Sequence, residues 1–186
     1  SDATFTREDL EKEMENFIGE ITQIPPMYSA IKVNGQKLYD LARKGIEVER
    51  KKRQVNIYSF KIVDFNFPKA TFKITCSKGT YIRTLIDDLG ENLGSYAYVN
   101  SLTRSKVGDF YLEDAINSDD LLNMSKEEVL KKLKPVDYAL KTYPKIILDK
   151  SYLKQATNGM TMAVDQMDVD SLHRVYVEDE FIGLGK

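Results

Sequence analysis

Residues 70–90, "ATFKITCSKGTYIRTLIDDLG", decide the fold, because a strand, a tight turn and an amphipathic helix follow one another directly. The first seven residues alternate apolar and polar side chains, as a half-buried strand does. Gly79 suits the turn, because glycine readily adopts a left-handed conformation. The helix that follows has one apolar face, formed by Ile82, Leu85, Ile86 and Leu89. Tyr81 and Arg83 lie at the junction between strand and helix, where sheet-based proteins tend to place their sites.

A second reading of the junction needs no site. Tyr81 can be a half-buried aromatic side chain beside an ordinary turn. Arg83 can be an exposed helical residue that pairs with Asp87, four residues further on. The spacing alone fits this reading as well.

The segments before this stretch predict an antiparallel partner strand and a packed helix. Residues 53–65, "RQVNIYSFKIVDF", alternate like a long strand, and Pro68 ends it. Residues 6–18 predict a helix that Thr6 can cap, with acidic residues in its first turn. Between them, the Asn34-Gly35 pair predicts a turn, followed by a short helix that Gly45 closes. The fold class is therefore α+β.

The chain after residue 94 predicts further strands and helices, and its sequence pattern changes after Pro135. Residues 95–110 predict one or two strands, and residues 118–123 and 125–133 predict two acidic, leucine-rich helices. Residues 137–186 predict a small, mostly β appendix, with a strand, a short helix and a hairpin that turns at Glu178–Glu180.

The amino-acid composition limits the kinds of metal, disulfide and membrane site that the chain can contain. The 186 residues include one cysteine, Cys76, and one histidine, His173, so an intrachain disulfide is impossible and a zinc site built from Cys and His is not expected. Apolar runs are too short for a membrane span, and no charged-then-apolar leader is visible. These observations predict a cytoplasmic, metal-free protein with no membrane partner.

Net charge is −2, but the charge is unevenly distributed. Residues 31–53 contain eight basic and three acidic residues, and local charge sets the potential that a phosphate backbone meets. Tyrosines that can stack on bases are interleaved with cations that can hold phosphates. The candidate RNA-binding residues of this region are Tyr28, Lys32, Lys37, Tyr39, Arg43, Lys44, Lys51, Lys52 and Arg53. A core strand and helix with solvated lysines is the alternative, and a solvated face explains the "RKKR" run equally simply.

A third segment, residues 101–110, "SLTRSKVGDF", adds Leu102, Arg104 and Lys106, with a surface strand as its alternative. No glycine-rich phosphate loop, Ser/His/Asp set or cysteine nucleophile is visible. The residues by themselves therefore indicate a globular α+β domain with a basic, aromatic segment.

Together, residues 19–48, "GEITQIPPMYSAIKVNGQKLYDLARKGIEV", residues 76–94, "CSKGTYIRTLIDDLGENLG", and residues 101–110 resemble the bacterial tRNA pseudouridine-55 synthase family in order and spacing. The resemblance runs from about Thr6 to Phe110 and continues more weakly into the tail. It implies a partial, mixed or antiparallel pseudouridine-synthase sheet with flanking helices, an RNA-gripping insertion and a small appendix.

The resemblance also implies chemistry. The family isomerises a flipped uridine in the tRNA T-arm to pseudouridine, without a cofactor, and uses an essential aspartate. Tyr81 resembles the family's second active-site tyrosine, Arg83 the arginine that pairs with the aspartate, and Leu102 an apolar wall under the base. Arg104 and Lys106 join the RNA-binding set. The partner implied is tRNA, with no obligate protein partner.

The family's aspartate motif lies upstream of all three matching segments. We therefore expect this chain to be a C-terminal part without the nucleophile, inactive by itself. The expected parts are an RNA-gripping insertion at 4–53, the C-terminal part of the catalytic domain at 54–134, and a PUA-like RNA-contacting domain at 137–186. Three alternatives remain: a non-catalytic RNA-binding module, a guide-RNA-dependent relative, and a structural protein with no RNA role.

Overall fold

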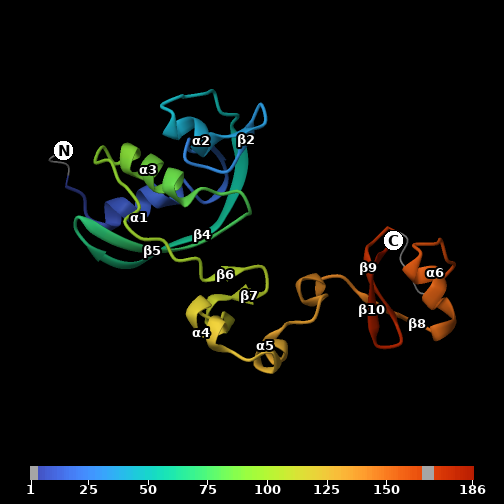
Figure 1. Ribbon diagram of the computed structural model, residues 1–186. Coiled ribbons are helices and arrows are strands. Elements are labelled where there is room, and N and C mark those ends of the chain that lie inside the picture. The colour runs from blue at the N-terminus through green and yellow to red at the C-terminus, as the bar shows by residue number, and fades with distance from the viewer. Residues whose placement is uncertain (1–3, 165–169) are drawn as a thin grey trace. The chain divides into compact units, whose positions relative to one another are not determined.

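The computed structural model describes residues 4–164 and 170–186, which form two compact units, residues 1–102 and 103–186 (Figure 1). Within the described ranges, no helix is long and apolar enough to cross a bilayer.

The first unit is built on an antiparallel three-stranded sheet with the order β1-β4-β5. Its strands are β1 (Gly19–Gln23), β4 (Arg53–Asn66) and β5 (Lys69–Cys76). Ile57 of β4 pairs with Gly19 on one side and with Cys76 on the other, so the long strand lies in the middle. The predicted long strand and its antiparallel partner are therefore confirmed.

Two helices cover one face of this sheet, α1 (Arg7–Glu15) and α3 (Ile82–Asn92) (Figure 1). Thr6 caps α1 in a capping box with Asp9, as its position predicted. The helix expected over residues 6–18 ends earlier, because Phe17 turns into the core and Gly19, at φ +93°, starts β1. The shared core of the helices and β4 consists of Leu10, Met14, Phe17, Ile57, Phe60, Leu85, Ile86 and Leu89.

Between β1 and β4, the chain forms a small hairpin and a short helix. The hairpin strands are β2 (Lys32–Val33) and β3 (Gln36–Lys37), and α2 (Leu38–Arg43) follows directly. Asn34 and Gly35 have φ values of +49° and +80°, which is the two-residue turn that an Asn-Gly pair favours. Leu38 is fully buried and anchors α2. The predicted turn and helix are thus confirmed.

The one or two strands predicted within residues 95–110 occur only at the end of this segment, as two-residue strands that begin at Lys106, and residues 95–105 contain no strand. Tyr96 has φ +55°, and its amide donates to the Gly90 carbonyl at 3.1 Å, so the chain bends sharply around the end of α3. This bend removes the extended backbone that a strand needs.

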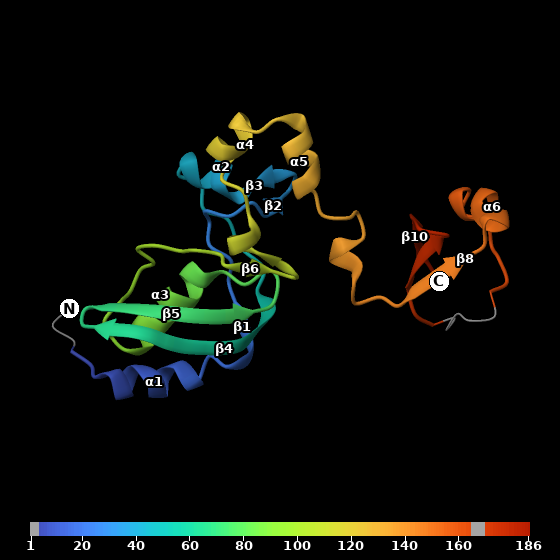
Figure 2. The ribbon, with the colours of Figure 1, turned by 90° about the horizontal axis from the view of Figure 1, so that it is seen from below.

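The second unit contains a hairpin whose two strands are each two residues long, two helices and a β appendix (Figure 2). Its first elements are β6 (Lys106–Val107), β7 (Phe110–Tyr111), α4 (Ser118–Asn123) and α5 (Lys126–Lys132). The appendix has the strand order β10-β9-β8, with β8 parallel and β10 antiparallel to β9. Its elements are β8 (Lys145–Leu148), α6 (Leu153–Thr157), β9 (His173–Val177) and β10 (Glu180–Gly185). Both predicted helices and the predicted hairpin are confirmed.

A buried polar cluster joins the start of the appendix to β9. Arg174 Nη1 donates to Asp137 Oδ2 at 2.8 Å, and Arg174 Nε donates to the Tyr143 carbonyl at 3.0 Å. The Tyr176 hydroxyl also donates to Asp137. The hydrogen bond from Tyr176, followed by Arg174, holds the pKa of Asp137 below its ordinary value against the opposing effect of burial.

The predicted division at residues 53 and 134 stays a prediction. Residues from the predicted 4–53 insertion share one core with β4 and α3. The boundary between the compact units falls at Leu102.

Candidate active-site residues and cationic surface

A short turn places Tyr81 at the beginning of α3. Gly79 takes φ +86°, and the Thr80 hydroxyl donates to the Ser77 carbonyl at 2.9 Å. The Ser77 hydroxyl accepts from the Asn56 amide at 2.9 Å, which ties the turn to β4. Tyr81 is the N-cap residue of α3, and Arg83 lies in its first turn.

The side chain of Gln23 fixes the backbone of Tyr81 in place. Gln23 is 1% exposed, and its amide group bonds both backbone groups of Tyr81. Gln23 Nε2 donates to the Tyr81 carbonyl at 3.2 Å, and the Tyr81 amide donates to Gln23 Oε1 at 3.0 Å. Sequence reasoning missed Gln23; its only signal is a polar residue at the end of a strand, just before Ile24-Pro25.

Arg83 is exposed and contacts the same segment. Its Nη2 donates to the Tyr28 carbonyl at 2.7 Å, across 55 residues of sequence. In the described part of the chain, no ion pair joins Arg83 to a carboxylate, so the alternative of an Arg83–Asp87 pair is not what the structure contains. The guanidinium keeps donors available for an anion, because one bond uses one of its five N–H groups.

Tyr81 and Arg83 therefore both lie against residues 23–28. Tyr28 itself is 58% exposed, so its ring is accessible. Leu102, the last residue of the first unit, is 61% exposed. Its expected place beside Tyr81 stays a prediction.

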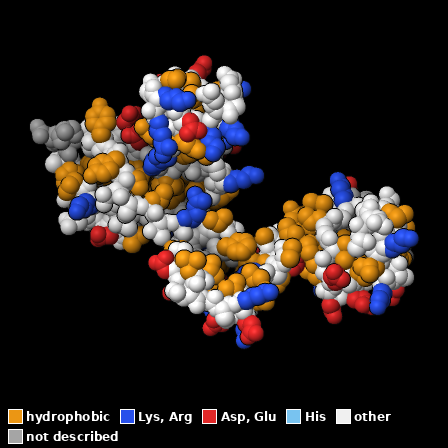
Figure 3. Space-filling view, in the orientation of Figure 1, with side chains coloured by type: hydrophobic (Ala, Val, Ile, Leu, Met, Phe, Trp, Pro, Cys, Tyr) orange, Lys and Arg blue, Asp and Glu red, His pale blue; other side chains and the backbone are white. Residues whose placement is uncertain are grey.

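Four of the predicted RNA-binding cations line one open hollow of about 570 Å³. The hollow lies between the β2–β3 hairpin and α2, and Lys and Arg side chains gather over this part of the first unit (Figure 3). Its lining residues are Lys32, Gly35, Gln36, Lys37, Asp40, Arg43 and Lys44. The structure thus places around one hollow four cations that are interleaved with tyrosines in the sequence.

Tyr39 adjoins these cations. Lys37 Nζ donates to its hydroxyl at 2.9 Å, and the Arg43 guanidinium carbon lies 5.5 Å from its ring centre. The hydrogen bond from Lys37 to Tyr39 raises the pKa of the Lys37 ammonium, with smaller help from Asp40.

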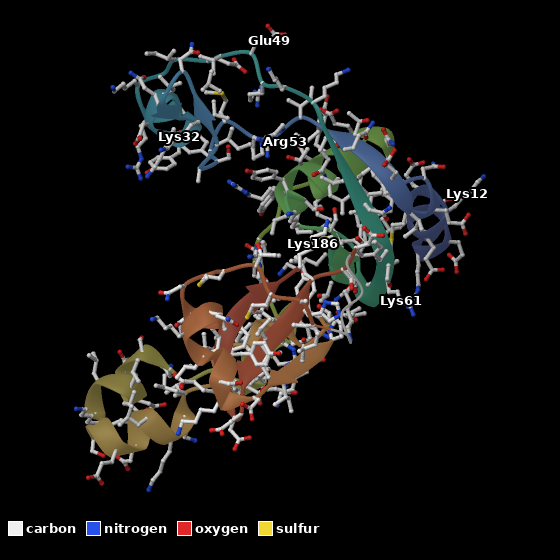
Figure 4. All side chains as sticks on the ribbon, turned by 90° about the vertical axis from the view of Figure 1, so that its right-hand side faces the viewer. Lys12, Lys32, Glu49, Arg53, Lys61 and Lys186 are labelled. Atoms are coloured by element: carbon white, nitrogen blue, oxygen red, sulfur yellow. The ribbon has the colours of Figure 1, made fainter. Side chains whose placement is uncertain are left out.

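Lys51 and Lys52 line a second open hollow, of about 620 Å³, together with Ile24, Glu47, Val48, Glu49 and Arg50. Sequence reasoning counted Arg50 in the basic run but left it out of the candidate RNA-binding residues. Arg50 holds the loop in place, because Nη1 donates to the Pro25 carbonyl at 3.1 Å and Nη2 pairs with Glu47 at 3.2 Å. Arg53 begins β4, as the side-chain view shows (Figure 4).

Arg104 and Lys106 are exposed and belong to the second unit. Lys106 Nζ donates to the Tyr111 hydroxyl at 2.7 Å, which raises the pKa of the Lys106 ammonium. Among residues 4–164 and 170–186, no cluster of three His, Cys, Asp or Glu side chains could hold a metal ion.

Two adjoining family models match this chain. The model described as TruB family pseudouridylate synthase (N terminal domain) matches residues 1–82. The model described as tRNA pseudouridylate synthase B C-terminal domain matches residues 83–141. The two matches meet within α3, next to Arg83.

Curated relatives named tRNA pseudouridine synthase B are similar along nearly the whole chain. The one from Clostridium kluyveri is 45% identical, with 96% of this chain and 63% of the relative covered. The one from Clostridium tetani is 44% identical, with 95% and 63% covered. The chain thus spans about 63% of the length of these relatives.

Solved structures share the fold. A chain in the crystal structure of a Cbf5-Nop10-Gar1 complex aligns with a TM-score of 0.74 and 26% identity, covering 98% of this chain and 56% of that one. A chain in a structure of an H/ACA RNP bound to a substrate RNA containing 2'-deoxyuridine aligns with a TM-score of 0.73 at 23% identity, which shows the fold alone.

Proposed function

The chain belongs to the TruB family of pseudouridylate synthases, and from that membership we propose that it forms part of an enzyme that isomerises uridine to pseudouridine in tRNA. The target we propose is uridine 55 of the T-arm, the substrate that the motif resemblance implies. A cytoplasmic location is part of the same proposal.

One observation carries the proposal. Tyr81 and Arg83 both contact residues 23–28, the segment that leads into the cationic hairpin. The two residues that we propose to act on a flipped base are thus bonded to the segment that leads into a surface suited to phosphates. An enzyme that acts on a base within folded RNA needs both, because it must hold the backbone while it extrudes the target nucleotide.

In this proposal Tyr81 lies against the flipped uracil, and Leu102 supplies an apolar wall beneath it. Arg83 pairs with the carboxylate that attacks the sugar. A guanidinium close to a carboxylate keeps the carboxylate ionised and fixes its direction. Because Arg83 is exposed and bonded to one backbone carbonyl, it is accessible to such a partner.

Release of tritium from tRNA labelled at C5 of uridine tests the activity. We expect no release from the 186-residue polypeptide alone, because Arg83 has no carboxylate partner among the described residues. Adding the remainder of the Clostridium kluyveri relative as a separate chain should restore release, and Arg83→Ala should abolish it. Turnover by the polypeptide alone, or rescue that survives Arg83→Ala, would contradict these assignments.

A non-catalytic RNA-binding module is the second candidate, favoured by an Arg83 that pairs with no carboxylate among the described residues and by the cation-lined hollows. Salt-dependent tRNA binding without any rescued tritium release would support it. The identity of 45% to a tRNA pseudouridine synthase B, against 26% to the Cbf5 chain, favours the stand-alone enzyme over a guide-RNA-dependent relative.

A further inference from the structure

The hollow between the β2–β3 hairpin and α2 brings like charges close together. Lys32 and Lys37 are directly opposite each other in the hairpin register, and like charges in such a pair destabilise it. Arg43 and Lys44 line the same hollow, with Asp40 as the one carboxylate among its lining residues. An anion bound between the cations would relieve the repulsion.

Two of these cations are arranged around the side chain of Tyr39. Lys37 Nζ is bonded to its hydroxyl at 2.9 Å and lies 5.2 Å from its ring centre. The Arg43 guanidinium carbon lies 5.5 Å from the same centre. Lys37 Nζ, bonded to the hydroxyl, lies at the edge of the ring, whereas the Arg43 distance falls within the roughly 6 Å over which a cation is attracted to an aromatic face. A base that stacked on Tyr39 would have to compete with Arg43 for one face of the ring.

The backbone around Tyr39 is also fixed. The Tyr39 amide donates to the Ser29 carbonyl at 3.1 Å, and the Leu38 amide donates to the Ile31 carbonyl at 2.8 Å. Leu38 is fully buried directly beside Tyr39. The cations are therefore presented from a rigid base, which lowers the entropy lost when they bind a ligand.

We propose that this hollow is a cradle for two neighbouring phosphates of an RNA strand, in which Tyr39 positions Lys37 and Arg43 and does not stack on a base. The proposal rests on the proposed RNA-binding function and replaces the stacking role that the sequence predicted for Tyr39. The raised pKa of Lys37 agrees with an ammonium that stays charged.

Tyr28 differs from Tyr39, because its ring is 58% exposed and only its carbonyl is engaged by Arg83.

The probe is a T-arm stem–loop RNA, and the measurement is its affinity for the 186-residue chain as a function of salt. The slope of log affinity against log salt reports the number of phosphates neutralised. A second probe has abasic residues in the loop, so that it keeps the phosphates and lacks the bases.

For Tyr39→Leu we expect the slope to fall by about 1–2 units, as expected when one or two phosphate contacts are lost. The loss should be equal on the intact and the abasic RNA, and it should not add to that of Lys37→Gln. Tyr39→Phe keeps the ring and loses the hydroxyl, so its loss should be smaller, and the Lys37 titration followed by ¹³C NMR at Cε should shift to lower pH. Tyr58→Phe, at a tyrosine that is 62% exposed on β4, is the matched control and should change nothing.

A loss of roughly 5- to 150-fold with an unchanged slope, confined to the intact RNA, is the signature of a stacked base and would overturn the proposal. So would an unchanged Lys37 titration in Tyr39→Phe, even if Tyr39→Leu fails to fold. If the unaltered chain binds RNA without any salt dependence, the proposed function falls together with the cradle. If it binds with a steep slope that Tyr39 does not influence, only the cradle falls.

Discussion

Replacing Gln23 by methionine removes a buried amide while it keeps the length of the side chain. The Tyr81 amide then loses its acceptor, whereas the Tyr81 carbonyl keeps the bond from the Leu85 amide at 3.0 Å. A buried donor without a partner costs about 1–3 kcal/mol. We therefore expect Gln23→Met to destabilise the first unit by about 2 kcal/mol. For a unit of this size, each kcal/mol corresponds to a fall in Tm of roughly 4–8 °C.

Urea unfolding followed by amide hydrogen exchange within α3 measures the first unit separately from the second. The Tyr81 amide should lose more protection than amides of β4, because the lost bond is local. Gln54→Met is the matched control: Gln54 accepts from Thr22 at 2.8 Å in an exposed position, and its loss should stay within about 0.5 kcal/mol. A Gln23→Met variant as stable as the Gln54→Met variant would refute the idea that Gln23 holds the site residue in place.

Three further predictions concern charge and close packing. Changing Lys51, Lys52 and Arg53 to Ala should weaken binding of all tRNAs about equally and lower the salt slope by about one unit per contact, whereas Lys12→Ala in α1 should leave the slope unchanged. The pKa of Asp137 in the folded protein is lowered from 3.8, so the ionised carboxylate stabilises the appendix above pH 3.8, and this stabilisation is lost as the pH falls through the lowered pKa. Acid unfolding of the appendix should show the loss, and Asp137→Asn should make the stability of the appendix less dependent on pH in this range. Gly90→Ala should destabilise the first unit by about 1–3 kcal/mol in a thermal melt, despite the better helix propensity of alanine, because a Cβ there would lie 2.4 Å from the Ala97 amide nitrogen.

The elements that local patterns determine were predictable. The alternation of residues 53–65, the apolar face of α3 and the Asn34-Gly35 turn each depend on neighbours in sequence, and each is present in the structure. The segment around Tyr96 was not, because its bend depends on the lack of a side chain at Gly90, six residues earlier. A close approach of this kind leaves no periodic pattern.

The candidate site shows the same limit more sharply. The sequence marked Tyr81 and Arg83 but not the residues that hold them, because a glutamine that bonds a backbone 58 residues away looks like any polar residue at a strand end. It also grouped Tyr39 with Tyr28 as stacking candidates, although the two rings have different surroundings once the hairpin forms. Residues 23–31 now connect these features: they hold Tyr81 and Arg83 at one end and accept the amides of Leu38 and Tyr39 at the other. One backbone segment thus links the cationic hollow to the first turn of α3 through hydrogen bonds that the sequence pattern does not reveal.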